Sequence, residues 1–315
     1  MKKELINIGN KSKKAITSQL NSKKKNKVLK DYCDLINKNK KLIINQNKKD
    51  IFTAQKKGLK KNLIDRLILD EKKISNIISS IRSIIKLKDP TNIILEKWKR
   101  PNGLNISKIS IPIGVIGVIY ESRPNVTSDV SSLCFKSGNA VILKGGSEAF
   151  NSNKTLADLF RKALKKNRVD PNFIQFIEKK ERRVVSYMLT QMKQFIDIII
   201  PRGGKSLVNE VQKKTKIPFI GHLEGICHTY IDKSANINMA KKIISNAKLR
   251  NTSICGATET VLFHKKIFKK FVNPILDHLK NEGCEIFADS KIRKAYKGNT
   301  KVAHKDNWSK EYLAP

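Results

Sequence analysis

The segment LRNTSICGATETVLFH at residues 249–264 contains a cysteine that could carry nucleophilic chemistry. Cys255 is surrounded by small or polar residues, and no second cysteine lies within metal-ligand spacing. A nucleophilic cysteine must be a thiolate in a partly open, electropositive setting, which Lys248 and Arg250 could supply. A free cysteine is more often a small buried hydrophobe, as we expect for Cys134. On these local residues alone, a structural role for Cys255 is slightly favoured.

Two glycine pairs follow predicted strands and precede predicted helices, where parallel sheets often bind phosphate. In IPRGGKSLVNEV (200–211), Gly203 and Gly204 precede a helix whose first N–H groups could bind an anion. The segment LKGGSEAFNSN (143–153) has the same form. The chain has no G-x-G-x-x-G fingerprint, and Ile199 stands where a P-loop would need glycine. Each segment alone is compatible with an ordinary turn, but together they favour a nucleotide site.

The composition is that of a globular and strongly basic chain. Its 315 residues are 39% hydrophobic, which argues against disorder, and carry a formal net charge of +38. Such a charge suggests nucleic-acid binding, but the lysines are spread along the chain and are not interleaved with aromatic residues, as base stacking would require. We therefore favour biased amino-acid usage over a nucleic-acid partner.

The cysteines and the apolar runs indicate the cellular compartment of the protein. The 5 cysteines form no CxxC motif and no short-spaced pair, a pattern typical of a reduced, cytoplasmic protein. His222 and His228 have no third ligand nearby in the sequence, so we expect no metal site. No apolar run approaches the roughly 20 residues of a membrane span, and the N-terminal MKKELINIGNKSKK lacks the apolar core of a signal peptide. We expect no membrane association.

The first 90 residues are predicted to be helical. One apolar stripe recurs at helical spacing, formed by Ile74, Ile77, Ile78, Ile81, Ile84 and Ile85. Asp70 is the expected N-cap of this helix, and Asp89-Pro90 is its expected stop. The stripe is therefore assigned to the core.

Residues 93–113 change to the period of strands. Pro101-Asn102-Gly103 is a turn signal between two such segments, which predicts a β-hairpin. The apolar residues switch parity along the second segment, which predicts a bulge near Ser107-Lys108.

From residue 114 onward, predicted strands alternate with predicted helices. The strands are expected at 114–121, 140–145, 173–178, 197–201, 218–223, 227–232 and 259–264, and the helices at 128–138, 152–167, 182–195 and 237–250. Continuous apolar strands with helices between them predict an α/β fold whose parallel sheet is covered on both faces.

The order of the motifs resembles the gamma-glutamyl phosphate reductases, or glutamate-5-semialdehyde dehydrogenases, of the aldehyde dehydrogenase superfamily. The matching segments are IPIGVIGVIYESRPNVTSDVSSLCFKSGNAVILKGGSEAFNSN, IPRGGKSLVNEV, HLEGICHTYID and CGATETVLFH, with LIDRLILDEKKI and WKRPNGLNISKISIPIGV near the N-terminus. The resemblance covers nearly the whole chain, and YESRPNVT and IPRGGKSL are specific to the family.

The resemblance implies an aldehyde-dehydrogenase-like architecture. A parallel-sheet cofactor domain is expected at 1–92 and 114–226, an oligomerisation hairpin at 93–113, and an α/β catalytic domain at 227–315. Because the family continues beyond the terminal EYLAP, we expect the chain to be a fragment whose catalytic domain is incomplete.

The implied activity is NADPH-dependent reduction of L-glutamyl 5-phosphate to L-glutamate 5-semialdehyde in proline biosynthesis, by a cytoplasmic homo-oligomer. Cys255 matches the nucleophile that forms a thioester as phosphate leaves. Asn125 matches the residue that stabilises the oxyanion together with the Cys255 backbone N–H.

The resemblance also assigns residues to the cofactor. Lys144 and Ser147 match the adenosine-ribose side of its site, Gly203 and Gly204 match the turn at its pyrophosphate, and Glu311 matches the residue that holds the nicotinamide ribose.

Several alternatives stay open. The chain could be a catalytically inactive fragment, or a basic nucleic-acid-binding protein on the same fold. Arg123 and Arg250 are the candidates for holding the charged groups of the substrate. Hydrolytic members of the superfamily have a glutamate base where this chain has His222, with Glu224 two places on. We therefore expect phosphate, rather than water, to cleave the thioester in the reverse direction.

Overall fold

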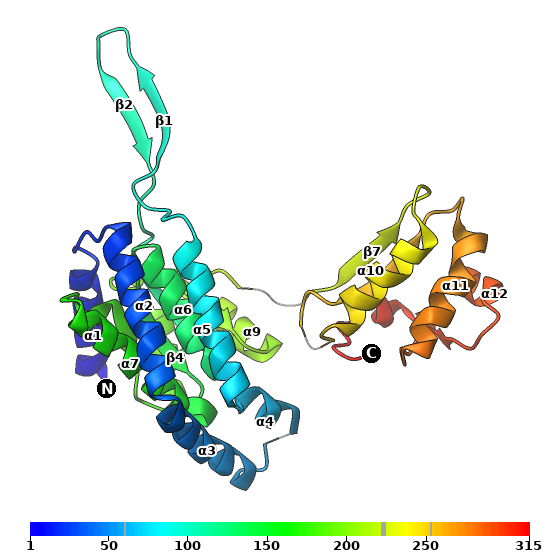
Figure 1. Ribbon diagram of the computed structural model, residues 1–315, viewed down its shortest axis with the longest axis horizontal. Coiled ribbons are helices and arrows are strands. Elements are labelled where there is room, and N and C mark those ends of the chain that lie inside the picture. Colours follow the sequence, from blue (N-terminus) through cyan, green and yellow to red (C-terminus); the bar gives the residue numbers. More distant parts are fainter. Residues whose placement is uncertain (60, 122, 222–224, 253) are drawn as a thin grey trace. The chain divides into compact units, whose positions relative to one another are not determined.

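The chain forms two compact units, Met1–His222 and Leu223–Pro315, each with a hydrophobic core of its own. The computed structural model describes residues 1–59, 61–121, 123–221, 225–252 and 254–315, with the backbone alone at Asn62 (Figure 1). The division falls between residues 222 and 223, and the catalytic domain is predicted to begin at residue 227.

Helices occupy most of the first 90 residues, as predicted. They are α1 (Lys2–Ala15), α2 (Ser22–Lys38), α3 (Lys40–Lys56), α4 (Lys61–Leu67) and α5 (Glu71–Lys86). Asp70 caps α5, because its side chain accepts a hydrogen bond from the Lys73 backbone N–H at 2.6 Å. The isoleucine stripe of α5 faces the core, with Ile74 and Ile81 fully buried.

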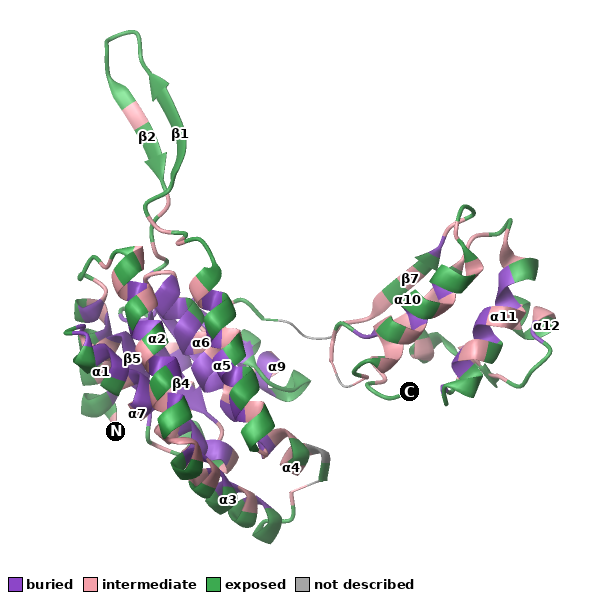
Figure 2. Cartoon of the chain, in the orientation of Figure 1, coloured by how far each residue is buried: buried purple, intermediate pink, exposed green. Residues whose placement is uncertain are grey.

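A parallel sheet of four strands forms the centre of the first unit, in the order β5–β4–β3–β6. Its strands are β3 (Val115–Tyr120), β4 (Ala140–Gly145), β5 (Ile174–Phe176) and β6 (Ile198–Arg202). Every residue of β3 and β4 is buried, which explains why these strands are continuously apolar in the sequence (Figure 2). The α/β prediction is confirmed.

The helices that connect and follow these strands are α6 (Pro124–Lys136), α7 (Phe150–Lys166), α8 (Arg182–Gln191) and α9 (Lys205–Lys214), with the short 3₁₀ helices η1 (Ser147–Ala149) and η2 (Pro171–Phe173). Two predicted boundaries were wrong. Helix α6 begins earlier than residue 128, because Pro124 occupies a first-turn position where its fixed φ favours the helix. Helix α8 ends at Gln191 rather than at residue 195. After it, the backbone N–H groups of Phe195 and Ile196 both donate to the Met192 carbonyl and form a separate turn.

The strand predicted at 218–223 was wrong over its described part, residues 218–221. Phe219 makes only an isolated parallel bridge with Ile199 of β6. Pro218 accepts a hydrogen bond from the Ile199 N–H but has no N–H of its own, so the ladder does not extend. His222 and Leu223 lie outside the described residues.

The predicted hairpin is present as β1 (Ile94–Lys99) and β2 (Asn105–Ile109), which pair in antiparallel register. Gly103 closes the turn at φ +86°. The bulge lies in β1 instead of β2: Ile94 pairs with Ile109 and Glu96 with Lys108, so Leu95 is the extra residue. Every residue of β1 is exposed (Figure 2).

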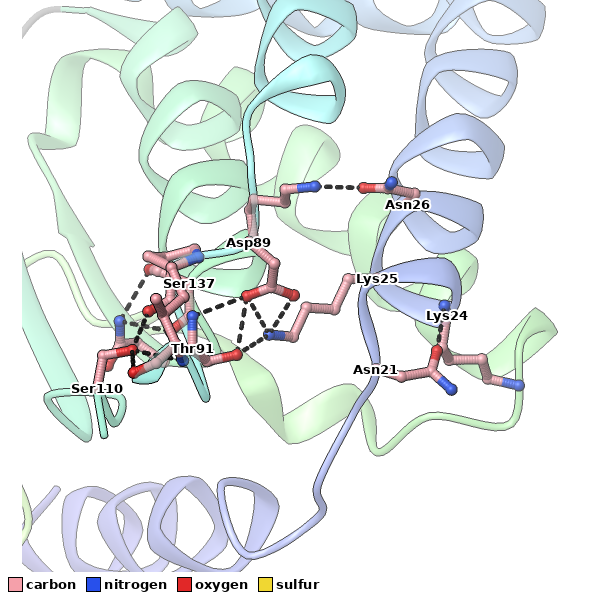
Figure 3. A network of polar contacts seen from close by, with 12 residues as sticks. Asn21, Lys24, Lys25, Asn26, Asp89, Thr91, Ser110 and Ser137 are labelled. Carbon is pink, nitrogen blue, oxygen red and sulfur yellow. Dashed lines mark hydrogen bonds and ion pairs between the residues drawn. The ribbon is translucent and has the colours of Figure 1, made fainter. Parts of the chain in front are cut away.

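A buried ion pair holds the base of the hairpin to α2 (Figure 3). The Lys25 ammonium donates to both oxygens of Asp89, at 3.1 and 3.0 Å, and to Thr91 Oγ1 at 3.0 Å. Thr91 in turn donates its N–H and hydroxyl to Asp89. On the opposite side of the base, Ser110 Oγ donates to the Pro90 carbonyl at 2.6 Å. The second leg of the hairpin is therefore tied to the first, which the ion pair holds to α2.

The second unit is built around a β-α-β element. Strands β7 (Cys227–Ile231) and β8 (Thr258–Phe263) are parallel and are joined through α10 (Ile237–Leu249). The remaining elements are α11 (Phe268–Asn281), β9 (Phe287–Ala288), α12 (Ser290–Ala295), β10 (Lys301–Val302) and the 3₁₀ helix η3 (Lys305–Ser309). Ile231, Ile244 and Ile275 are buried in the core between these elements.

Across the described residues, no helix is both long and apolar enough to span a membrane.

Candidate active site

The predicted cofactor residues of the first unit gather at one edge of its sheet. Lys144 lies near the end of β4 and Ser147 begins η1, while Gly203 and Gly204 follow β6. Strand β3 lies between β4 and β6, and Glu121 follows it directly. Because the carboxyl ends of parallel strands meet at one edge, the topology brings both glycine-pair segments to either side of Glu121.

Glu121 binds the glycine turn after β6. Its Oε2 accepts a hydrogen bond from the Gly204 N–H at 3.0 Å, and Gly204 is the N-cap residue of α9. A side chain at Gly203 would collide with this carboxylate, because an added Cβ would lie 2.5 Å from Glu121 Oε2. The turn therefore donates a backbone N–H to an anionic oxygen at the start of a helix. A phosphate is bound by donors in the same arrangement.

Lys144 is the buried cation of this edge. Its side chain is almost fully buried and its Nζ donates to the Gly145 carbonyl at 2.9 Å. Burial lowers the pKa of Lys144, while the charges of Glu148 and Glu181 act in the opposite direction. Ser147 is exposed on the same connection.

Cys255 lies on the connection between α10 and β8 in the second unit, and it is partly exposed. Cys227 Sγ donates to the Cys255 carbonyl at 3.3 Å. Gly225 approaches the same carbonyl so closely that an added Cβ would lie 2.2 Å from the oxygen. The backbone of the Cys255 loop is thus held by a thiol and by a glycine that no larger residue could replace without movement.

Glu311 is brought to the same glycine. The Gly225 N–H donates to Glu311 Oε1 at 3.4 Å. Gly225 therefore contacts both Cys255 and the residue predicted to hold the nicotinamide ribose, although these two are far apart in the sequence.

Lys248, one of the two cations that could provide an electropositive setting for Cys255, has an anionic partner in the structure. The Lys248 ammonium pairs with the buried carboxylate of Glu259 at 2.8 Å, so its charge is locally balanced. Arg250 is exposed just beyond the end of α10. Sequence spacing could not show this pairing, because Glu259 belongs to β8 and meets Lys248 only through the fold.

Asn125 lies in the first turn of α6, in the first unit. Its Nδ2 donates to Asp129 Oδ2, one helical turn later, at 3.0 Å. This bond holds the orientation of the amide and uses one of its two hydrogens, and the other has no partner among the described residues. Arg123, the other candidate in this segment, is the N-cap residue of the same helix.

The structure thus brings the predicted residues together in two groups, one in each unit. The first unit contains Asn125 and the sheet-edge residues, and the second contains Cys255 and Glu311. The roles assigned to these residues stay predictions.

Sequence reasoning did not identify three residues that contact these groups: Glu121, Asp129 and Gly225. The i, i+4 spacing of Asn125 and Asp129 was the only local signal for any of them. His222 and Glu224, named for the hydrolytic position, lie outside the described residues.

Comparison with known proteins identifies the family. Residues 3–284 match the aldehyde dehydrogenase family. A gamma-glutamyl phosphate reductase of Bartonella tribocorum is 48% identical over 260 residues, which is 82% of this chain and 63% of the relative. One from Brucella suis is 42% identical over 311 residues, covering 98% of this chain and 74% of the relative.

A solved structure is similar over nearly the whole chain. The crystal structure of the gamma-glutamyl phosphate reductase of Thermotoga maritima superposes with a TM-score of 0.92 at 35% identity, over 99% of this chain and 75% of that one. An acetylating aldehyde dehydrogenase of Geobacillus thermoglucosidasius, at 18% identity and a TM-score of 0.61, shares the fold. The chain therefore belongs to the aldehyde dehydrogenase family of oxidoreductases and, within it, to the gamma-glutamyl phosphate reductases.

Proposed function

We propose that the protein reduces L-glutamyl 5-phosphate to L-glutamate 5-semialdehyde with NADPH and releases phosphate, as a step of L-proline biosynthesis. The observation that carries the proposal is the Cys255 loop. In a chain of this family, a partly exposed cysteine lies on a loop held at Gly225, and the same glycine binds Glu311. Buried cysteines such as Cys134 offer no comparable access.

The chemistry assigned to Cys255 is acyl transfer. Its thiolate attacks the carbonyl carbon of the acyl phosphate, and the bond from that carbon to the phosphate oxygen breaks, so phosphate leaves with the electron pair and a thioester remains. NADPH, when bound, supplies the hydride that reduces the thioester. The resulting thiohemiacetal collapses to the aldehyde and regenerates the thiolate. The free amide hydrogen of Asn125 and the Cys255 N–H are assigned to the oxyanion of each step.

The residues of the sheet edge suit a dinucleotide. Gly203 and Gly204 would receive the pyrophosphate, because the N–H that now bonds Glu121 can bond a phosphate oxygen. Lys144 and Ser147 would hold the adenosine ribose, and the cation of Lys144 suits the extra phosphate of NADPH. Glu311 would hold the nicotinamide ribose.

Replacing the nucleophile tests the reaction. In Cys255→Ala, NADPH-dependent reduction should be lost while NADPH affinity changes by no more than a few-fold. Cys284→Ala is the matched control, because Cys284 is buried in the same unit, and it should keep most of the activity. Turnover by Cys255→Ala at the wild-type rate would disprove the nucleophile assignment.

The exposed hairpin supports a second proposal, that the protein works as a homo-oligomer. Leu95, Leu104, Ile111 and Ile113 are each more than half exposed, an apolar surface that a second copy could cover. Replacing Leu95 and Leu104 with lysine should lower the mass measured by light scattering. An unchanged mass in a well-folded variant would argue against the hairpin as the interface.

A further inference from the structure

A cavity of about 330 Å³ lies in the first unit beside Asn125. It is lined by residues of α4, α5, α6 and the connection between α4 and α5. Its volume is within the range of small-molecule sites in proteins, which are about 300–1,000 Å³. Of the residues that line this cavity, only Asn125 has been assigned a role in the proposed reaction.

Three helices supply charged and polar residues to the cavity. Arg66 comes from α4, Lys73 and Ser80 from α5, and Asn125 and Asp129 from α6. Lys73 and Ser80 are two turns apart, and Asn125 and Asp129 are one turn apart, so each pair lies on one face of its helix. Helix α5 packs against α6, which brings these two faces together.

Asp129 presents an acceptor that the described part of the chain leaves unpartnered. Its Oδ2 accepts from Asn125, but its Oδ1 is buried without a hydrogen-bond partner among the described residues. Burial raises the pKa of the Asp129 carboxyl, although the Asn125 amide and the nearby Ser80 hydroxyl act in the opposite direction. A buried carboxylate oxygen without a donor is costly, and a cationic ligand would remove that cost.

Arg66 presents the complementary charge. Within the described residues its guanidinium has no ion pair or hydrogen bond. Lys73 lines the same cavity and donates one hydrogen bond, from Nζ to the Asp65 carbonyl at 3.0 Å. A planar guanidinium matches a carboxylate through two parallel hydrogen bonds, and the nearby ammonium adds positive charge.

We propose that this cavity binds the amino-acid end of the substrate, with Asp129 Oδ1 accepting the α-ammonium group and Arg66 binding the α-carboxylate. The inference rests on the proposed function, which places the reacting carbonyl at Asn125. A cavity with one buried carboxylate acceptor and two cations suits a zwitterion better than a simple carboxylic acid. Asp129 then has two tasks, since Oδ2 orients Asn125 and Oδ1 selects the substrate.

Three aldehydes separate the two contacts in the oxidative, phosphate-dependent direction. L-Glutamate 5-semialdehyde carries both charged groups, 5-oxopentanoate lacks the ammonium, and butanal lacks both. The ratio of kcat/KM between the first two reports the ammonium contact, and the ratio between the last two reports the carboxylate contact. Any general loss of catalysis from a disturbed Asn125 affects all three and cancels in the ratios.

Asp129→Asn should lower the kcat/KM ratio of L-glutamate 5-semialdehyde to 5-oxopentanoate by about 10- to 100-fold. Arg66→Gln should lower the ratio of 5-oxopentanoate to butanal by a similar factor, as expected for hydrogen bonds to charged groups. Each variant should leave the other ratio within a few-fold. Asp34→Asn and Arg82→Gln are matched controls on exposed positions of α2 and α5, and they should change neither ratio.

A binding measurement keeps the inference testable without turnover. By calorimetry, L-2-aminopentanoate should bind the wild-type chain more tightly than pentanoate does, and Asp129→Asn should remove that preference. Wild-type ratios in both variants, with no change in the binding preference, would overturn the inference while leaving the reaction intact. Absence of NADPH-dependent turnover together with a preserved binding preference would instead count against the proposed function alone.

Discussion

Replacing Lys25 with methionine should strongly destabilise the first unit. The Lys25 side chain is 2% exposed and its ammonium donates to Asp89 and Thr91, whereas the Asp89 side chain is 13% exposed (Figure 3). Methionine retains the apolar stem but leaves the Asp89 carboxylate buried without its cation. Breaking a buried ion pair from one side costs about 3–5 kcal/mol in the free energy of unfolding.

The structure favours the lower end of that range, about 3 kcal/mol. Asp89 keeps the hydrogen bonds from the Thr91 N–H and hydroxyl in the variant, at 3.1 and 2.8 Å, and water can reach part of its side chain. In the double variant Lys25→Met/Asp89→Asn neither charge of this pair remains, while the buried Lys136 beside it keeps its hydrogen bonds to Asn26 and the Ile85 carbonyl. The double variant should therefore be more stable than Lys25→Met alone, which shows the coupling between the two residues.

Urea unfolding at several pH values measures both effects. In the wild type, burial tends to raise the pKa of Asp89, but hydrogen bonds from Lys25 and Thr91 and the charge of Lys25 outweigh it, so the pKa lies below the ordinary value of an aspartate. A depressed carboxyl pKa gives stability that is present above the unfolded-state pKa and is lost as the pH falls through the folded-state value.

The stability difference between wild type and Lys25→Met should therefore be full near neutral pH and shrink below about pH 4. A loss under 1 kcal/mol at pH 7, or strict additivity in the double variant, would refute this account of the pair.

Three further changes test other parts of the structure. Asn125→Ala should lower kcat about 100-fold through loss of an oxyanion donor, and a change confined to KM in steady-state kinetics would contradict that role. Gly114→Ala should lower the free energy of unfolding in urea by at least ~2 kcal/mol, because Gly114 has φ +128° and an added Cβ would lie 2.2 Å from Asp197 Oδ2. Gly283 is the control, because it has φ +84° with open space around it, and Gly283→Ala should cost only about 1 kcal/mol. Burial raises the pKa of the Cys134 thiol to about 12, so iodoacetamide at pH 8 should modify Cys255 well before Cys134, and mass spectrometry of the labelled peptides would show any reversal.

Much of the architecture could be predicted because its causes are local in the sequence. The isoleucines of α5 repeat with the helical period, and Asp70 supplies the cap that starts the helix. Strands β3 and β4 are apolar throughout because both faces of a covered parallel sheet are buried. Pro101-Asn102-Gly103 closes the hairpin for reasons that lie within the turn itself.

The errors occurred where a distant partner or a single backbone group decided the outcome. The segment after Lys216 looks like a strand, but Pro218 cannot donate to a neighbour and the ladder does not extend. The ion pair between Lys248 and Glu259 also depends on the fold, because the two residues lie on different elements. The bulge of the hairpin lies at Leu95 because the pairing register, rather than the parity of one strand, determines which residue is extra.

For the site, local residue chemistry singled out Cys255 and the glycine turn after β6, and the motif order added Asn125 and the roles of all three. Only the tertiary structure showed that Glu121 accepts a hydrogen bond from the Gly204 N–H. It also showed that Gly225 contacts both Cys255 and Glu311. Likewise, only the fold places Arg66 and Asp129 on the wall of one cavity. Periodicity and turn chemistry act between residues close in the chain and can therefore be read from sequence. Side-chain partners on different elements depend on strand order and helix packing, which bring together residues whose spacing in the chain carries no signal.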